Sequence, residues 1–99
     1  MSKEECTVVE IIKAVRGKVE ELKRALALIV PLARKSKGCL QYELLSPMGD
    51  REEFLILMRW EKLADLHRHE TSDYVAEFVR KNDKYLYDDV TQTEWKKLL

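Results

Sequence analysis

The chain lacks the features that mark disulfide-rich, metal-binding or membrane-spanning proteins. Its two cysteines, Cys6 and Cys39, are too few for a disulfide framework and do not have the spacing of a metal site. The longest hydrophobic stretch, residues 25–32, contains Pro31 and is far shorter than the roughly 20 residues that span a bilayer. We therefore expect free thiols, no metal, no membrane contact and a cytoplasmic location.

An excess of charge of one sign is also missing. Lys and Arg together number 18, as do Asp and Glu, so the charges cancel. Nucleic-acid-binding domains are usually basic, and a polybasic cluster is needed to bind anionic lipid. The aromatic-rich strand motif of RNA-binding sheets is missing too. We predict no nucleic-acid partner and no lipid-surface partner.

No linker, internal repeat or low-complexity segment divides the 99 residues, which suffice for one domain, residues 1–99. A hydrophobic content of 45% and a charged content of 36% suit a folded domain with a soluble surface. A domain of this size buries only about two-thirds of its unfolded surface, so its core is thin. Pairing with a second copy is a common way to add buried area.

The spacing of apolar residues predicts the element order β-α-β-β-α-β. Short runs rich in β-branched or alternating residues indicate strands, and apolar residues that recur every three or four positions indicate helices. We expect Leu63, Leu66, Tyr74 and Phe78 on the buried side of the second helical segment. The predicted strands are residues 8–15, 39–45, 53–60 and 88–95; the predicted helices are residues 18–37 and 63–85, the second broken at residues 71–73. This order is the split βαβ plan, which predicts an α+β domain of the ferredoxin-like class with an antiparallel sheet.

The third predicted strand is apolar on both faces. Successive side chains of a strand point in opposite directions, so Leu55 and Leu57 lie on the face opposite Phe54 and Ile56. One face covers the helices, whereas the other face of a lone sheet is normally polar. The sheet of a second subunit is the simplest cover, which predicts a homodimer. Shielding by the C-terminal tail is the alternative.

An ordered set of motifs resembles the antibiotic biosynthesis monooxygenase family. The family has a glycine–cysteine–leucine–x–tyrosine strand, then a strand that ends in tryptophan, then a helix with a histidine nine residues later. Here these motifs correspond to residues 38–42, to residues 54–60, and to the spacing between Trp60 and His69. Gly17 and Ser72 also match, and the resemblance covers residues 8–90.

This resemblance implies a dimeric α+β barrel in which two ferredoxin-like sheets pack face to face. Members include oxygenases that act on quinols and aromatic phenols without metal or flavin, haem-degrading enzymes and an isomerase of a phosphorylated signal molecule. The sequence departs from the family pattern at Met58, where a glutamate is frequent, and at Asp73, where a second histidine is frequent. Glu10 stands where haem-degrading members have an asparagine, which argues against haem degradation.

Two residues are candidates for proton transfer. His69 carries an imidazole that can move a proton at neutral pH; the alternative is a structural histidine that braces the neighbouring loop. Glu10 interrupts an apolar strand, and a buried carboxylate there would have a raised pKa and could act as a base. The alternatives for Glu10 are an exposed position or an ion pair with Arg59. His67 diverges from His69 by about 200° on a helix, so the pair cannot share a metal.

Five further side chains are candidates for binding a substrate. Trp60 could form a wall that stacks on a flat ring, or it could be a core tryptophan whose indole N–H is satisfied. Tyr42, Tyr74, Phe78 and Met58 could line the same cavity or belong to the core.

Three functions are open at this point. The first is a cofactor-independent monooxygenase acting on a small quinol or aromatic phenol, with proton transfer assisted by His69. The second is an isomerase or tautomerase that uses the same histidine without oxygen. The third is a non-catalytic dimeric small-ligand-binding or stress-response protein, because a fold does not fix a reaction.

Overall fold

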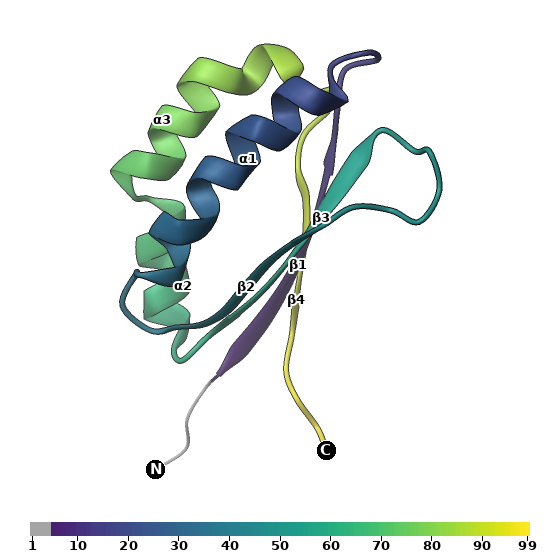
Figure 1. Cartoon of the computed structure of the whole chain (residues 1–99). Coiled ribbons are helices and arrows are strands. Elements are labelled where there is room, and N and C mark those ends of the chain that lie inside the picture. Colours follow the sequence, from purple (N-terminus) through teal and green to yellow (C-terminus); the bar gives the residue numbers. More distant parts are fainter. Residues whose placement is uncertain (1–4) are drawn as a thin grey trace.

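A computed structural model describes residues 5–99 and shows an antiparallel sheet covered on one face by helices (Figure 1). The element order is β-α-β-β-α-β, with the second crossover made of two helices and a short 3-10 turn. The elements are β1 (Cys6–Lys13), α1 (Val19–Arg34), β2 (Cys39–Leu45), β3 (Glu53–Trp60), α2 (Leu63–Glu70), α3 (Asp73–Asn82), η1 (Asp83–Tyr85) and β4 (Thr91–Trp95). The predicted α+β, ferredoxin-like fold is confirmed.

Strand limits follow from the pairing partners. The predictions for β2 and β3 agree with the structure, whereas β1 lies two residues earlier than predicted and β4 begins three residues later. At one end of β1, Cys6 pairs with Trp60; beyond the other end, Ala14 leaves the sheet ladder and pairs with Leu86. The sequence pattern predicted the strands, but the neighbouring chain segments determine where each one stops.

The sheet has the order β2-β3-β1-β4, which places β3 and β1 at its centre. Side chains of alternate residues point toward the helices and form the core with the buried face of α1. The core side chains from the sheet are Val8, Ile12, Tyr42, Phe54, Ile56, Met58 and Trp60; those from α1 are Leu22, Leu26, Ile29 and Ala33. The space between the sheet and the helices is where the candidate residues meet.

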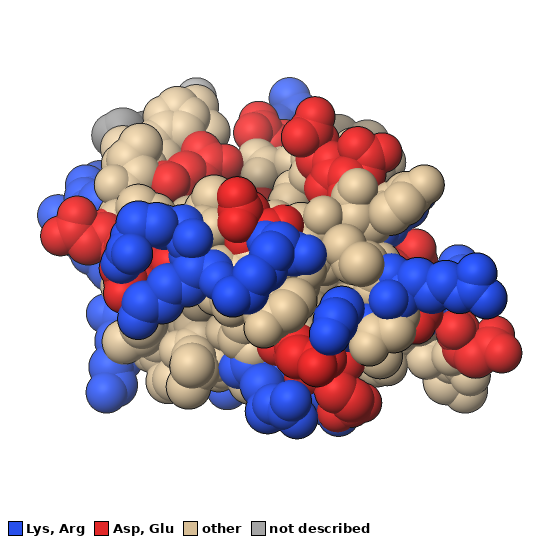
Figure 2. All heavy atoms as spheres, turned by 90° about the horizontal axis from the view of Figure 1, so that it is seen from above, with Lys and Arg blue, Asp and Glu red and all other residues tan. Residues whose placement is uncertain are grey.

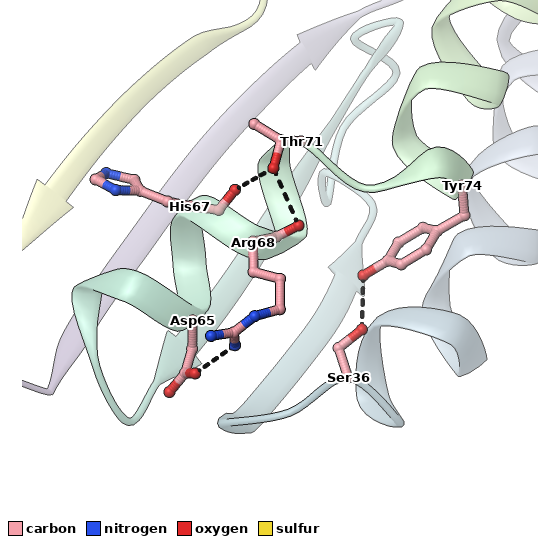
Figure 3. Close-up of polar contacts among 6 residues, drawn as sticks. All are labelled: Ser36, Asp65, His67, Arg68, Thr71 and Tyr74. Carbon is pink, nitrogen blue, oxygen red and sulfur yellow. Dashed lines mark hydrogen bonds and ion pairs between the residues drawn. The ribbon is translucent and has the colours of Figure 1, made fainter.

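The second helical segment breaks at Ser72, as predicted. The Ser72 hydroxyl oxygen accepts a hydrogen bond from the backbone N–H of Val75 at 3.3 Å, which caps the first turn of α3. The Thr71 hydroxyl donates to the carbonyl oxygen of His67 at 3.0 Å and so closes the end of α2 (Figure 3). Leu63 was expected to be buried, but its side chain is 42% exposed because it lies on the first turn of α2, away from the core.

The opposite face of the sheet carries no helix (Figure 1). Its central residues pair across the strands, Val9 with Leu57 and Ile11 with Leu55, and all four are half-buried apolar side chains. Basic and acidic side chains are interspersed on the face seen in Figure 2. Within residues 5–99, every helix is too short or too polar to cross a membrane.

Candidate functional site

His69 lies in the last turn of α2, where its side chain is 6% exposed and is surrounded by three aromatic rings. The ring centroids of His69 and Trp60 are 4.9 Å apart with an interplanar angle of 30°. Tyr42 meets His69 edge-on at 5.5 Å, and Tyr74 lies at the same centroid distance with a 51° tilt. We call His69, Trp60, Tyr42 and Tyr74 the aromatic cluster. Three separate elements supply the aromatic rings: β3, β2 and α3.

One ring nitrogen of His69 has a hydrogen-bond partner and the other has none among residues 5–99. Nδ1 of His69 lies 2.6 Å from the Tyr74 hydroxyl oxygen. This oxygen in turn lies 2.8 Å from the Ser36 hydroxyl oxygen, the contact drawn in Figure 3. Nε2 has no hydrogen-bond partner among residues 5–99. Burial lowers the pKa of His69 below its ordinary value, while the nearby Glu70 carboxylate opposes this shift. The imidazole is therefore mainly neutral at pH 7 and can accept a proton.

Trp60 carries an unsatisfied hydrogen-bond donor. Its side chain is fully buried, and its indole N–H has no acceptor within the described part of the chain. Trp60 is therefore a core tryptophan, as in the alternative, but its indole N–H is not satisfied within residues 5–99. Most buried donors in proteins have a partner, so this N–H is an exception among the described residues. Burial also raises the pKa of Tyr42, so its hydroxyl keeps its proton at neutral pH.

Glu10 lies on the face of the sheet that carries the helices, between Ile56 and Gln92 in the neighbouring strands. Burial, and to a lesser degree the Glu70 carboxylate, raise the pKa of Glu10 to about 7. The alternative of an ion pair with Arg59 is wrong, because Arg59 lies on the opposite face and binds Glu5 at 3.2 Å. Glu10 also affects the pKa of Tyr42, so its carboxyl group lies near the aromatic cluster.

We predict that Glu10→Gln changes the pH dependence of stability. The folded state holds the Glu10 proton more tightly than the unfolded state, so wild-type stability falls as pH rises between 4.5 and about 7. A glutamine side chain does not ionise, so the Glu10→Gln variant does not lose this stability as pH rises. The difference in unfolding free energy between Glu10→Gln and wild type should therefore rise by about 2–3 kcal/mol from pH 4.5 to 8.

Urea denaturation at several pH values measures this difference. Glu20→Gln, which removes an exposed carboxylate from α1, is the control for loss of a charge. A pH-independent difference for Glu10→Gln would contradict a buried, perturbed carboxyl group at this position. The contribution of His69 to the pH dependence of stability has the opposite sign, because its lowered pKa makes wild-type stability fall as pH drops below 6.5. This contribution is the same in wild type and in Glu10→Gln, so it cancels in the difference.

The remaining predicted residues lie around the cluster. Met58 is fully buried on β3, between Tyr42 on β2 and Val8 on β1, on the face of the sheet that the helices cover. Phe78 lies on α3 and lines an apolar groove of about 220 Å³ between α1 and α3, which Tyr74 also lines. Tyr74 therefore belongs both to the aromatic cluster and to the wall of this groove.

Three polar residues near the cluster were not predicted. Ser36 contacts Tyr74 although they are 38 residues apart in sequence, and Gln92 donates to a Glu70 carboxylate oxygen at 2.8 Å. No local motif marks these residues, because each becomes relevant only through a contact between distant elements. His67 is exposed and points away from Tyr74 (Figure 3).

The two cysteines flank Trp60 in the sheet, since Cys6 and Cys39 are its pairing partners on β1 and β2. Both are free thiols, and burial raises the pKa of each. A raised pKa lowers the thiolate fraction and hence the nucleophilicity at neutral pH. Among residues 5–99, no three His, Cys, Asp or Glu side chains are grouped as metal ligands.

Comparison with known proteins agrees with this architecture. The family model described as "Antibiotic biosynthesis monooxygenase" matches residues 6–81. Protein PA3566 from Pseudomonas aeruginosa has a TM-score of 0.92 and 29% identity, with 100% of this chain and 99% of that chain covered. A Nitrosomonas europaea protein, provisionally described as an antibiotic biosynthesis monooxygenase, has a TM-score of 0.90 and 11% identity, with 99% and 94% covered.

A protein with the same provisional description from Caulobacter crescentus CB15 has a TM-score of 0.86 and 17% identity, with 98% of this chain and 92% of that chain covered. At identities of 11% and 17%, these last two structures show a shared fold alone. No curated protein sequence matches the chain.

Proposed function

The chain belongs to the antibiotic biosynthesis monooxygenase family, and from this premise we propose that it is a cofactor-independent monooxygenase acting on a small quinol or aromatic phenol. The observation that carries the proposal is a neutral, buried His69 whose Nε2 is free, stacked on a tryptophan with an unsatisfied indole N–H. This arrangement offers a base and a hydrogen-bond donor to a flat ring that bears an acidic hydroxyl group.

In the proposed reaction the substrate is its own reductant. His69 Nε2 takes a phenolic proton, and the resulting anion transfers one electron to O₂. The two radicals combine to form a C–O bond, and loss of water from this hydroperoxide breaks the O–O bond. One oxygen atom stays in the organic product and the other leaves as water, so a quinol plus O₂ gives a hydroxyquinone plus water.

The aromatic cluster and its neighbours supply the other proposed roles. The indole N–H of Trp60 and the hydroxyl of Tyr42 are donors that would stabilise the oxygen anion formed on deprotonation. The ring faces of Trp60 and Tyr74, with the thioether of Met58, would hold an aromatic substrate in place. Phe78 would contact an apolar substituent that reaches the groove between α1 and α3. Glu10 would exchange a second proton with the substrate, since its pKa lies near 7.

The experiment is oxygen uptake with a set of benzoquinols and naphthoquinols, corrected for uptake without protein. Under ¹⁸O₂, mass spectrometry of the product should show one labelled oxygen atom, with the second in water. Absence of protein-dependent uptake across the set, or a product without label, would contradict the proposal.

An isomerase or tautomerase is the second candidate. It is favoured by the presence of two proton carriers near the cluster, His69 and Glu10, because isomerisation removes a proton at one atom and returns it at another. This reaction needs no oxygen. Turnover of a keto–enol substrate under strict anoxia would favour the isomerase, and loss of turnover on removing oxygen would favour the monooxygenase.

The proposed assembly is a homodimer in which two sheets pack through the faces that carry no helix. The support is the apolar centre of this face, formed by Val9, Ile11, Leu55 and Leu57, and the exposed Trp95 at its edge. Apolar side chains at the centre of a sheet face are normally covered. The proposed setting is the cytoplasm, where free thiols stay reduced.

We predict that Leu57→Glu dissociates the dimer. A glutamate at the centre of the interface would bury an unpaired carboxylate, which costs several kcal/mol, so the dissociation constant should rise at least about 100-fold. Sedimentation equilibrium measures the change. Leu28→Glu is the matched control, because Leu28 is 73% exposed on α1, on the opposite side of the molecule. Equal dimerisation of Leu57→Glu and wild type would contradict a sheet-to-sheet dimer.

A further inference from the structure

We propose that Ser36 and Tyr74 act as positioning residues that hold His69 in the Nδ1–H tautomer, so that Nε2 is the atom that accepts the substrate's proton. The consequence for catalysis rests on the function proposed above. The tautomer itself is a property of the resting protein and can be measured without any substrate.

The three residues form a continuous chain of short polar contacts. His69 Nδ1 lies 2.6 Å from the Tyr74 hydroxyl oxygen, which lies 2.8 Å from the Ser36 hydroxyl oxygen. The Ser36 hydroxyl lies 3.0 Å from the carbonyl oxygen of Leu32 (Figure 3 shows the contact between Ser36 and Tyr74). Each hydroxyl has one proton to donate, so the direction of one bond determines the direction of the next.

The Leu32 end of the chain determines this direction. A carbonyl oxygen can only accept, and in a regular helix the N–H of Ser36 would bond the oxygen of Leu32. At the end of α1, however, the N–H of Ser36 bonds the carbonyl oxygen of Ala33, three residues earlier, at 3.0 Å. The tightened last turn therefore leaves the oxygen of Leu32 to the Ser36 hydroxyl, which uses its single proton there.

The other bonds follow in order. With its proton directed to Leu32, the Ser36 oxygen can only accept from Tyr74, so the Tyr74 hydroxyl donates to Ser36. The Tyr74 oxygen must then accept from His69, which places the proton on Nδ1. Because burial keeps the imidazole neutral, the lone pair is on Nε2, the nitrogen that has no partner among residues 5–99.

This chain predicts an effect of Ser36 on an atom that it does not touch. In Ser36→Ala the Tyr74 hydroxyl loses its acceptor, and the best remaining acceptor is Nδ1 of His69. The Tyr74 proton should turn to Nδ1, which moves the imidazole proton to Nε2 and removes the free base. If the proposed function is correct, kcat should fall at least about tenfold, since a wrong tautomer disables a histidine base.

The experiment is ¹⁵N NMR of the histidine ring nitrogens in the protein without substrate, at a pH where His69 is neutral. We expect a protonated Nδ1 and an unprotonated Nε2 in wild type, and the reverse in Ser36→Ala. Ser36→Thr keeps the hydroxyl and should retain the wild-type pattern. Thr71→Ala is the matched control, because the Thr71 hydroxyl also donates to a carbonyl oxygen four residues earlier but has no contact with Tyr74.

A wild-type protein with the proton on Nε2 would overturn the proposal, as would an unchanged tautomer in a folded Ser36→Ala variant. Tyr74→Phe provides a second test, since removal of the hydroxyl should give a mixture of both tautomers. If the NMR pattern is as expected but no quinol supports oxygen uptake, the tautomer assignment stands and the proposed function fails. The two failures are therefore distinguishable.

Discussion

His69→Ala is expected to lower kcat/KM for oxygen-dependent quinol oxidation by at least about 100-fold, because a positioned general base contributes roughly 10²–10⁴ in rate. The Nε2 atom of His69 is the base proposed to deprotonate the substrate. The imidazole is buried, with its ring centroid 4.9 Å from that of Trp60. In His69→Ala the indole N–H of Trp60 and the Tyr42 hydroxyl remain as hydrogen-bond donors, but the proposed acceptor of the substrate's proton is gone. Oxygen-electrode rates over a range of quinol concentrations measure the effect.

His67→Ala is the matched control for this prediction. His67 is two residues away on the same helix, but it is exposed and points away from Tyr74 (Figure 3), so its removal should leave the rate within about twofold. His69→Gln keeps most of the side-chain volume and tests whether a loss of rate comes from a cavity rather than from the missing base. Rates for a folded His69→Ala within threefold of wild type would contradict the role of His69.

Gly38→Ala is expected to destabilise the protein by about 3–5 kcal/mol, from backbone strain plus steric overlap. Gly38 has a φ of +81°, a conformation that a residue with a Cβ adopts only at a cost. A Cβ at this position would lie 2.0 Å from Oδ2 of Asp65 and 2.6 Å from its Cβ. Asp65 is buried at the start of α2, and its carboxylate accepts a hydrogen bond from Arg68 at 2.7 Å (Figure 3).

The overlap at Gly38 also affects the site, because α2 carries His69. Relief of the clash requires α2 to move away from the start of β2, which would shift the imidazole relative to Trp60 and Tyr42. A loss of kcat/KM should therefore accompany the loss of stability in Gly38→Ala. Asp65→Ala does not remove the conflict, since the Cβ of Asp65 is itself too close.

Gly17→Ala separates the two contributions. Gly17 has nearly the same φ, +80°, but no atom lies within 4 Å of a Cβ built there. Gly17→Ala should therefore report the backbone cost alone, about 1–2 kcal/mol. Urea denaturation of both variants measures the difference. Equal destabilisation of Gly17→Ala and Gly38→Ala would show that the approach of Asp65 to Gly38 has no energetic consequence.

The sequence predicted the central hairpin and the helix break closely, for local reasons. The apolar run of β3 and the turn residues before it are contained within a few positions, and the hydroxyl of Ser72 caps α3 through its neighbour Val75. The burial of Leu63 was predicted wrongly, because a residue at the start of a helix can match an apolar spacing and still lie beyond the edge of the core.

The sequence by itself therefore determined the fold class and brought His69, Trp60 and Tyr42 forward as candidates, since periodicity and motif spacing are properties of the chain. Only the tertiary structure decided which atoms of these residues are free. The contact of Ser36 with Tyr74 and the orphan N–H of Trp60 depend on how separate elements pack. Glu10 also gains its pKa of about 7 from packing, because burial and the Glu70 carboxylate act on it only in the folded chain.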